Sequence, residues 1–174
     1  MKNITFSGIL LMIFNFSTTV SAQKKDFYEI VQKKNVAKVL DDLNAFASAA
    51  DFKSYFDLYA EKSTFIGTDA TEIWTKKEFM DYAKPHFDKG KAWSFTSLKR
   101  NISFSKDGNY AWFDELLDTQ MKLCRGSGVL EKTAGKWKVK QYVLSMTVPN
   151  VVSSEVIKIK SPIEDAIIFD LKKN

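Results

Sequence analysis

Two residue types that build metal and disulfide sites are almost absent from this sequence. Its 174 residues include one cysteine, Cys124, and one histidine, His86. An internal disulfide needs two cysteines, and a zinc site needs about four nitrogen, sulfur or carboxylate ligands, so we expect neither. Asp114, Glu115 and Asp118 also lack the spacing of a calcium-binding loop. The sequence therefore predicts no metal and no cofactor.

Motifs of several enzyme and nucleic-acid-binding classes are missing as well. There is no G-x-S-x-G stretch and no glycine-rich phosphate loop with its lysine. The 26 basic and 21 acidic residues give a net charge of +5, and no long block of one sign carries it. Such a mild and scattered charge argues against a nucleic-acid partner. No repeat or linker divides the chain, and its 45% hydrophobic content suits one globular domain with a core.

The first 22 residues have the pattern of a secretory signal peptide. Lys2 provides a positive start, an apolar run extends from about Gly8 to Phe16, and small residues end at Ala22. The run is too short to span a membrane, and no cysteine follows it to carry a lipid anchor. We therefore expect export to the periplasm or the extracellular space, with no membrane attachment after cleavage. Residues 23–34 would then lead into the domain.

Three helices are predicted in the first half of the mature chain. Apolar residues at spacings of three and four indicate an amphipathic helix over residues 36–50, and a short helix with an aromatic face follows over 51–59. Residues 63–74 indicate a strand that runs into a loop. Thr75 and Glu78 then form a capping box, which predicts the start of a third helix. The buried face of this helix should carry Phe79, Ala83 and Phe87.

From Trp93 onward the apolar period changes from helical to alternating, which indicates a sheet. Long antiparallel strands are expected over residues 93–105, with a slip in phase near 97–99 that suggests a bulge, and over 110–119, 120–133 and 135–150. Helices followed by such strands predict an α+β fold with the helices on one face of a curved sheet. In the extension over residues 151–174, Ser161-Pro162 predicts that a last helix begins there.

Four stretches, FIGTDATEIW, AWFDELL, RGSGVLEKTAGKWKV and LSMTVPN, keep a common order and spacing over about residues 35–150. They resemble the exported bacterial branch of the SnoaL-like family in the nuclear transport factor 2 (ketosteroid isomerase-like) superfamily. The resemblance implies a cone, in which a strongly bent mixed sheet wraps around the first long helix and leaves a pocket between sheet and helices. Members of the superfamily include isomerases, dehydratases, cyclases, small-molecule binders and domains that only dimerise or bind protein, so the fold alone does not choose an activity.

Asp114 and Glu115 are the candidate acidic groups of such a pocket. As neighbours on one strand they point to opposite faces, so only one of them can face the inside of the cone. A carboxylate among aromatic side chains could act as a general base, and the alternative for Asp114 is an ion pair or a solvated position. Arg125 could clamp a carboxylate-bearing ligand, because Gly126 and Gly128 allow a close approach. Its alternative is an ion pair with Asp114 or Glu115.

The last strand supplies further candidate pocket residues. Strict alternation puts one set of side chains on a single face, namely Trp137, Val139, Gln141, Val143 and Ser145. In many members of the resembling family this strand follows a pattern like W-K-I-x-x-x-H-x-S, with the histidine and the serine facing the pocket. Here Ser145 matches the serine, while Val143 stands at the histidine position. The resemblance thus implies that the proton shuttle of those relatives is missing.

Trp74, Trp112 and Tyr142 are candidate ligand contacts, with core packing as the alternative for the two tryptophans. Three functions stay open at this point. The first is an exported domain that binds a small apolar or carboxylate-bearing molecule in an aromatic pocket. The second is an isomerase, dehydratase or cyclase that uses a pocket carboxylate. The third is a dimerisation or protein-binding module, and a homodimer through the sheet face is compatible with the first two.

Overall fold

The computed structural model describes residues 7–173, and for residues 7–26 it describes the backbone alone. Residues 1–6 of the expected signal peptide lie outside the described residues, so cleavage and export stay predictions. The elements, in chain order, are α1 (Ser7–Ser48), α2 (Phe52–Asp57), β1 (Tyr59–Ile66), β2 (Ile73–Thr75), α3 (Lys76–Phe87), β3 (Thr96–Phe104), β4 (Tyr110–Thr119), β5 (Lys122–Thr133), β6 (Lys136–Met146), η1 (Asn150–Val152) and α4 (Ser153–Leu171).

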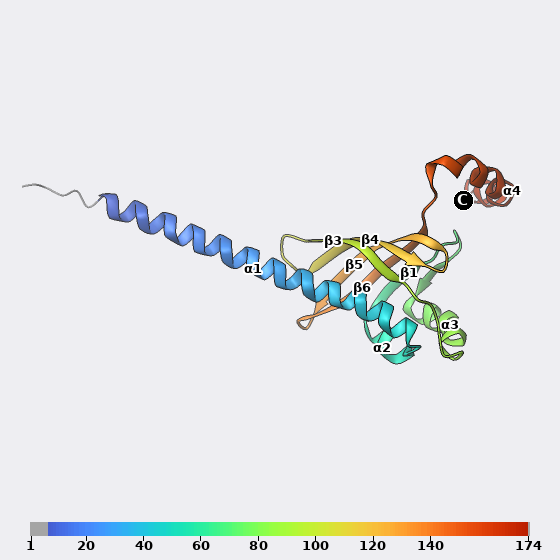
Figure 1. Cartoon of the computed structure of the whole chain (residues 1–174), viewed down its shortest axis with the longest axis horizontal. Helices are drawn as coiled ribbons and strands as arrows, with labels where there is room; N and C mark the ends of the chain where they lie inside the picture. Colours follow the sequence, from blue (N-terminus) through green and yellow to red (C-terminus); the bar gives the residue numbers. More distant parts are fainter. Residues whose placement is uncertain (1–6, 174) are drawn as a thin grey trace, which may run out of the picture.

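The six strands form one curved sheet in the order β2-β1-β6-β5-β4-β3. Strands β1 and β6 pair in parallel, and every other neighbouring pair is antiparallel, so the sheet is mixed. Figure 1 shows the sheet with α1, α2 and α3 packed along one side of it. The predicted α+β class, a curved mixed sheet against N-terminal helices, is confirmed.

The second half of α1 packs against the inner face of the sheet. Val36, Leu40, Leu43 and Ala47 repeat at spacings of three and four residues, and all four are almost fully buried. This is the apolar stripe of an amphipathic helix, and its burial against the sheet stabilises the fold more than helix propensity does. The first part of α1 extends well beyond the sheet (Figure 1).

Residues 23–34, expected to lead into the domain, are helical and belong to α1. Two of their side chains contact the end of the β5–β6 hairpin. The Trp137 indole donates a hydrogen bond of 2.9 Å to the Gln32 side-chain oxygen, and the Lys132 ammonium donates to the same oxygen at 3.0 Å. The Lys132 ammonium also donates to the Tyr28 hydroxyl at 3.0 Å. The contact between α1 and the sheet therefore extends back to Tyr28.

Helices α2 and α3 both begin at side-chain caps. The Asp51 carboxylate accepts a hydrogen bond from the Ser54 amide at 3.0 Å and is the N-cap of α2. At α3 the Thr75 amide donates to the Glu78 carboxylate at 2.9 Å, and the Glu78 amide donates to the Thr75 hydroxyl at 3.4 Å. The capping box predicted from the sequence is confirmed. So is the buried face of α3, formed by Phe79, Ala83 and Phe87.

Three strand pairs contain a register shift, and only the shift in β3 was predicted. The pairing of β1 with β6 shifts between Tyr59 and Thr64. The register of β3 shifts between Ser97 and Lys99, where the sequence shows a slip in its alternation. The third shift is a bulge in β6, where Val139 pairs with Leu130 and Gln141 pairs with Val129. Lys140 is thus the extra residue of the pair. Because side chains alternate along a strand, one extra residue inverts the two faces from that point on.

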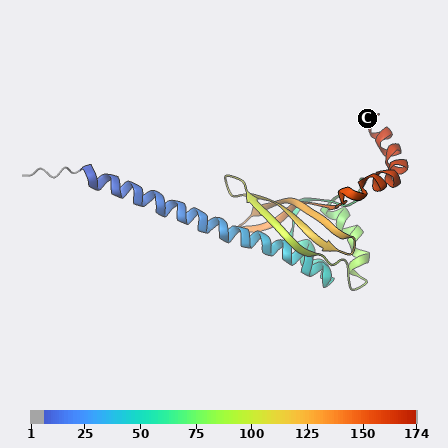
Figure 2. The same cartoon turned by 45° about the horizontal axis from the view of Figure 1, so that its top comes forward.

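The chain after β6 differs from the prediction. Helix α4 begins at Ser153 rather than at Ser161, and Pro162 lies inside it. Pro162 has no backbone N–H to donate to the carbonyl of Lys158, four residues earlier. The Ser161 hydroxyl donates to the neighbouring Ile157 carbonyl at 2.7 Å. Helix α4 buries no side chain, and it projects away from the sheet (Figure 2). Over the described residues, no helix is both long and apolar enough to cross a membrane.

Candidate functional site

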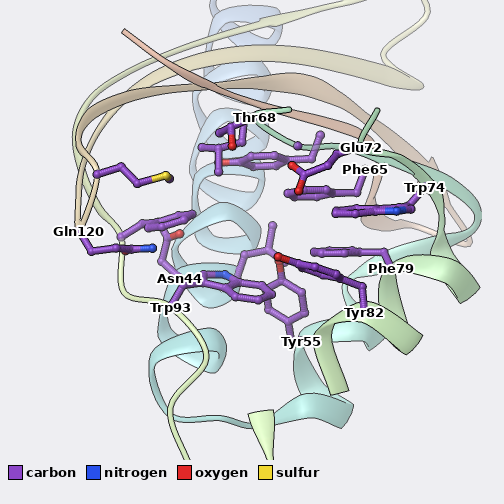
Figure 3. Close-up of a pocket in the computed structure, with 16 residues that line it drawn as sticks. Asn44, Tyr55, Phe65, Thr68, Glu72, Trp74, Phe79, Tyr82, Trp93 and Gln120 are labelled. Carbon is purple, nitrogen blue, oxygen red and sulfur yellow. The ribbon is translucent and has the colours of Figure 1, made fainter. Parts of the chain in front are cut away.

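A cavity of about 170 Å³ lies between the inner face of the sheet and helices α1, α2 and α3. Half of its 16 lining residues are aromatic (Figure 3), and these are Tyr55, Phe65, Trp74, Phe79, Tyr82, Trp93, Phe95 and Tyr142. Leu43, Leu144 and Met121 add aliphatic and thioether surface. The cavity is therefore a mainly apolar site, which is the usual chemistry of a small-molecule pocket.

Several of the aromatic rings are parallel to one another. Phe65 stacks on Phe79 with centroids 4.0 Å apart and an interplanar angle of 13°. Phe65 is also parallel to Tyr142 at 5.8 Å and 5°, and Trp74 stacks on Tyr82 at 4.4 Å and 24°. Rings held by stacking have few rotamers open to them. The cavity wall is thus preorganised, with flat faces that share one direction.

Polar groups enter the cavity from its loops and from α1. Thr68 and Glu72 come from the loop between β1 and β2, Gln120 comes from the β4–β5 turn, and Asn44 comes from α1. Figure 3 shows Gln120 and Asn44 on one side of the cavity and Glu72 on another. Glu72 is the only acidic residue of the lining, so the cavity itself offers no set of metal ligands.

A buried charge network lies directly behind Tyr142. The Glu115 side chain is 1% exposed, and its Oε1 accepts a hydrogen bond of 3.1 Å from the Tyr142 hydroxyl. Its Oε2 accepts from the Arg100 Nε at 2.9 Å, and the Arg100 Nη2 lies 2.8 Å from the same oxygen. The Arg100 Nη1 donates to the Asp41 carboxylate at 2.8 Å and to the Ala37 carbonyl at 3.1 Å. The network joins α1, β3, β4 and β6.

The pairing in this network keeps Arg100 charged and Tyr142 neutral. Burial lowers the pKa of Arg100, but the Glu115 and Asp41 carboxylates outweigh burial, so the pKa of Arg100 is raised overall. Burial, followed by the charge of Glu115, raises the pKa of the Tyr142 phenol well above its ordinary value. Tyr142 therefore stays protonated, and its hydroxyl donates its hydrogen bond to Glu115.

Gly126 on β5 makes room for this network. It pairs with Glu115 on one side and with Leu144 on the other. A Cβ atom at position 126 would lie 2.4 Å from the Tyr142 hydroxyl and 3.0 Å from the Glu115 Cγ. The close approach that the sequence suggests at this glycine is thus made by the side chains of two neighbouring strands.

The structure divides the predicted site residues between the two faces of the sheet. Trp74 and Tyr142 line the cavity. Glu115 faces inward but lies behind Tyr142, and Asp114 faces outward, where its carboxylate accepts from the Asn101 amide at 3.0 Å. Trp112 shares the outward phase of Asp114 and is 51% exposed. Neither Trp112 nor Asp114 reaches the cavity.

Arg125 also lies on the outer face, where it is exposed and pairs in register with Leu116 and Ser145. The expectation that Arg125 clamps a ligand in the pocket is therefore wrong. Alternation along β5 turns Cys124 and Gly126 inward and Arg125 outward. The alternative expectation, an ion pair of Arg125 with Asp114 or Glu115, is wrong as well, because Glu115 forms its ion pair with another arginine and Asp114 accepts from Asn101. The partner of Glu115 is Arg100, on the other neighbour of β4.

Val143 and Ser145 lie on the outer face as well, so the expectation that they contact a ligand in the pocket is also wrong. The bulge at Lys140 shifts the inward positions of β6 to Tyr142 and Leu144, both of which are buried. Strict alternation, which put Val143 and Ser145 in line with Trp137, fails at this bulge. The consecutive polar residues Lys140 and Gln141 interrupt the alternation of β6 at this point, but this interruption alone does not specify how β6 pairs with β5.

Sequence reasoning missed several residues of the site. Arg100 follows the exposed Lys99 on β3, and its role depends on partners from α1 and β4. Glu72 and Tyr82 were not singled out, although Glu72 lies two residues before Trp74 and Tyr82 lies on the helix that follows it. The alternation of β3 after its bulge could have placed Arg100 on the inner face, together with Ile102 and Phe104.

The SnoaL-like domain family matches residues 36–149. This match covers most of the chain and includes every strand of the sheet. The chain belongs to the SnoaL-like family. No curated protein matches its sequence.

Solved structures of the nuclear transport factor 2-like (NTF2-like) group share the fold of this SnoaL-like protein. A candidate dehydratase of the NTF2-like family from Streptomyces avermitilis superposes with a TM-score of 0.61 at 12% identity, over 70% of this chain and 99% of the other. An NTF2-like protein of unknown function from Pseudomonas putida gives 0.59 at 11% identity, over 70% and 90% of the two chains. An NTF2-like protein from Cytophaga hutchinsonii gives 0.56 at 16% identity, over 67% and 98%. At these identities the likeness shows the fold.

Proposed function

We propose that this SnoaL-like protein binds a small, flat and largely apolar molecule in the cavity between its sheet and helices. The observation that carries the proposal is the wall of parallel aromatic rings around Phe65, Phe79 and Trp74, with polar groups confined to a few positions. Aromatic surface provides a large contact area, and a few polar groups fix a ligand's orientation.

The cavity volume limits the size of the ligand. A dry protein cavity of about 150 Å³ holds one benzene molecule. At about 170 Å³, this cavity suits one aromatic ring with a short substituent. It lies below the range of roughly 300–1,000 Å³ that drug-sized ligands occupy.

The state of Glu115 argues against its use as the general base of an enzyme. A general base needs a free lone pair within reach of the substrate. The Glu115 carboxylate is out of reach of the cavity, because it is 1% exposed and Tyr142, to which it is hydrogen-bonded, forms the cavity wall in its place. Asp114, the other carboxylate proposed for an isomerase, dehydratase or cyclase, faces outward. Neither is placed to take a proton from a molecule in the cavity.

Calorimetric titration with single-ring probes tests the binding proposal. Indole and benzyl alcohol should bind the native protein, and Trp74→Ala should weaken binding about tenfold, because about 1.4 kcal/mol of contact is lost. Trp112→Ala provides the matched control, since it removes the same side chain from the outer face. The proposal fails if neither probe binds, or if the two tryptophan variants lose affinity equally.

The outer face of the sheet supports a homodimer as a further proposal. Trp112 and Leu123 are 51% and 46% exposed on this face, and Trp112 pairs in register with Val129. An exposed apolar surface of this kind commonly marks an interface between two copies. Sedimentation should show a dimer that Trp112→Glu converts to a monomer while Trp74→Ala does not. A native protein that sediments as a monomer at every concentration would overturn this proposal.

Export stays a proposal that rests on the sequence pattern of residues 1–22. Expression of the full-length chain in a bacterial host should yield a mature protein in the periplasm or the medium. Its first residue, determined by N-terminal sequencing, should be Gln23. Recovery of the protein only from the cytoplasm with its original N-terminus would contradict the proposal.

A further inference from the structure

The cavity wall contains one charged side chain, and its charge is negative. None of its 16 lining residues is Lys, Arg or His, and Glu72 is the only Asp or Glu. The remaining lining is aromatic, aliphatic or neutral and polar. An anionic group on a ligand would therefore meet a like charge without a compensating cation, whereas a cationic group would meet an opposite charge.

The loop between β1 and β2 fixes the position of Glu72. Its Oε2 accepts from the Asp69 amide at 3.2 Å, and its backbone carbonyl accepts from the Gly67 amide at 2.9 Å. A Cβ atom at Gly67 would lie 2.1 Å from the Glu72 Oε2, so the carboxylate rests directly against the backbone at this glycine. Figure 3 shows the carboxylate turned toward the rings of the cavity, next to Phe65.

The Glu72 carboxylate has no cationic partner among residues 27–173, where eleven salt bridges form between other residues. By contrast, the carboxylate of Glu115 behind the cavity wall is neutralised by Arg100. Glu72 is a half-buried residue. Its carboxylate lies without a counter-charge beside a mainly apolar space, and this favours a cation in that space.

The aromatic walls favour the same charge. Aromatic rings carry negative potential on their faces and attract ammonium groups, and tryptophan does so best. Trp74, two residues after Glu72, lies in the cavity wall with Tyr82 stacked on it at 4.4 Å. A carboxylate and electron-rich rings thus surround the same space.

We propose that the natural ligand of the cavity is a small organic cation, an aromatic ring that carries a protonated amine or a quaternary ammonium group. Glu72 pairs with the cationic group, and the parallel rings hold the flat body of the ligand. This inference rests on the proposed binding function and specifies its ligand class. It replaces the carboxylate-bearing ligand expected from the sequence, because Arg125 does not reach the cavity.

Three probes of nearly equal size and different charge test the inference. At pH 7 benzylamine is a cation, benzyl alcohol is neutral and benzoate is an anion. Calorimetric titration of the full chain should show benzylamine binding at least tenfold more tightly than benzyl alcohol, with no detectable binding of benzoate. Glu72→Gln should bring benzylamine down to the affinity of benzyl alcohol and leave benzyl alcohol unchanged. The glutamine keeps an oxygen that can accept from the Asp69 amide, so the loop retains its hydrogen bond.

Glu61→Gln is the matched control, because Glu61 is 95% exposed outside the cavity. It should leave all three affinities unchanged. If benzyl alcohol binds as tightly as benzylamine, or if Glu72→Gln leaves their ratio unchanged, Glu72 only fixes the loop and the inference fails while the binding function stands. If none of the three probes binds, the proposed function fails, and the inference fails with it.

Discussion

At the scale of single residues, Gly126 determines how the cavity wall is built. Its missing side chain lets Glu115 and Tyr142 meet above the strand, and this contact fixes the Tyr142 ring in the wall. The sequence predicted that one of Asp114 and Glu115 faces inward, because alternation along a strand is a local property. It could not predict that Arg100 neutralises Glu115, since that contact depends on strand order and on the position of α1.

Gly126→Ala should destabilise the protein by about 1–3 kcal/mol, the usual effect of overpacking a core. The added methyl group would push the Tyr142 hydroxyl away from Glu115 and leave a buried carboxylate with one partner fewer. Urea unfolding followed by circular dichroism measures the change. Ser127→Ala, at the next position of β5 on its outer face, should change stability by less than about 0.5 kcal/mol. Equal effects of the two substitutions would show that the contact above Gly126 contributes nothing.

At the scale of elements, the sequence predicts best where local signals decide the structure. The capping box at Thr75 and Glu78 placed the start of α3 correctly, because both hydrogen bonds lie within one helical turn. The bulge at Lys140 escaped prediction because it is a property of two paired strands. Its effect on the site is large, since it exchanges Val143 and Ser145 for Tyr142 and Leu144 on the inner face. Of the predicted ligand contacts, only Trp74 and Tyr142 therefore reach the cavity.

Helix α4 shows the opposite limit of local signals. Ser161-Pro162 has the pattern of a helix start, yet the helix already begins at Ser153. None of its side chains is buried by the rest of the domain, so the helix forms without packing against the sheet. Large apolar side chains such as Ile159 and Ile163 are consequently exposed, at 75% and 68%.

Removal of residues 151–174 should leave the stability of the domain unchanged, because no core contact is lost. We expect the melting temperature of the shortened chain to lie within about 2 °C of that of the full chain. Differential scanning calorimetry of both chains checks this. Leu144→Ala, which removes a buried side chain from β6, should lower the melting temperature by several times as much. A shortened chain that melts as early as Leu144→Ala would show that α4 packs on the domain.

At the scale of the whole molecule, the fold class followed from the order of helical and alternating segments, and the family from four sequence stretches. The parallel pairing of β1 with β6 did not follow from either pattern, because it joins strands that are more than sixty residues apart. The same pairing brings the aromatic residues of α2, β1 and β6 together. Tyr55, Tyr59 and Tyr142 become fully or almost fully buried there, and the first two hydroxyls lie 3.1 Å apart.

These three tyrosines predict how stability depends on pH. Burial raises the pKa of each phenol above the ordinary value of about 10, and the Glu115 charge adds to the effect at Tyr142. As the pH rises above about 10, tyrosines of the unfolded chain lose their protons before the buried ones do. The contribution of these buried, protonated tyrosines to the free energy of unfolding is therefore fully present below about pH 10. Above that pH it is lost by up to about 1.4 kcal/mol per pH unit for each tyrosine.

Tyr142→Phe isolates one of these contributions from the alkaline loss of lysine charges. The phenylalanine has no proton to lose, so the free energy of unfolding of the variant should fall less steeply between about pH 10 and pH 12, by about 1.4 kcal/mol per pH unit. At pH 8 the same variant should be less stable than the native protein by about 1–3 kcal/mol, because Glu115 loses a buried donor. The two stability curves should therefore converge as the pH rises. Tyr110→Phe, at an exposed position of β4, should run parallel to the native curve throughout. Urea midpoints measured across this range decide the matter, and a Tyr142→Phe curve that runs parallel to the native one would contradict the buried, neutral state of Tyr142.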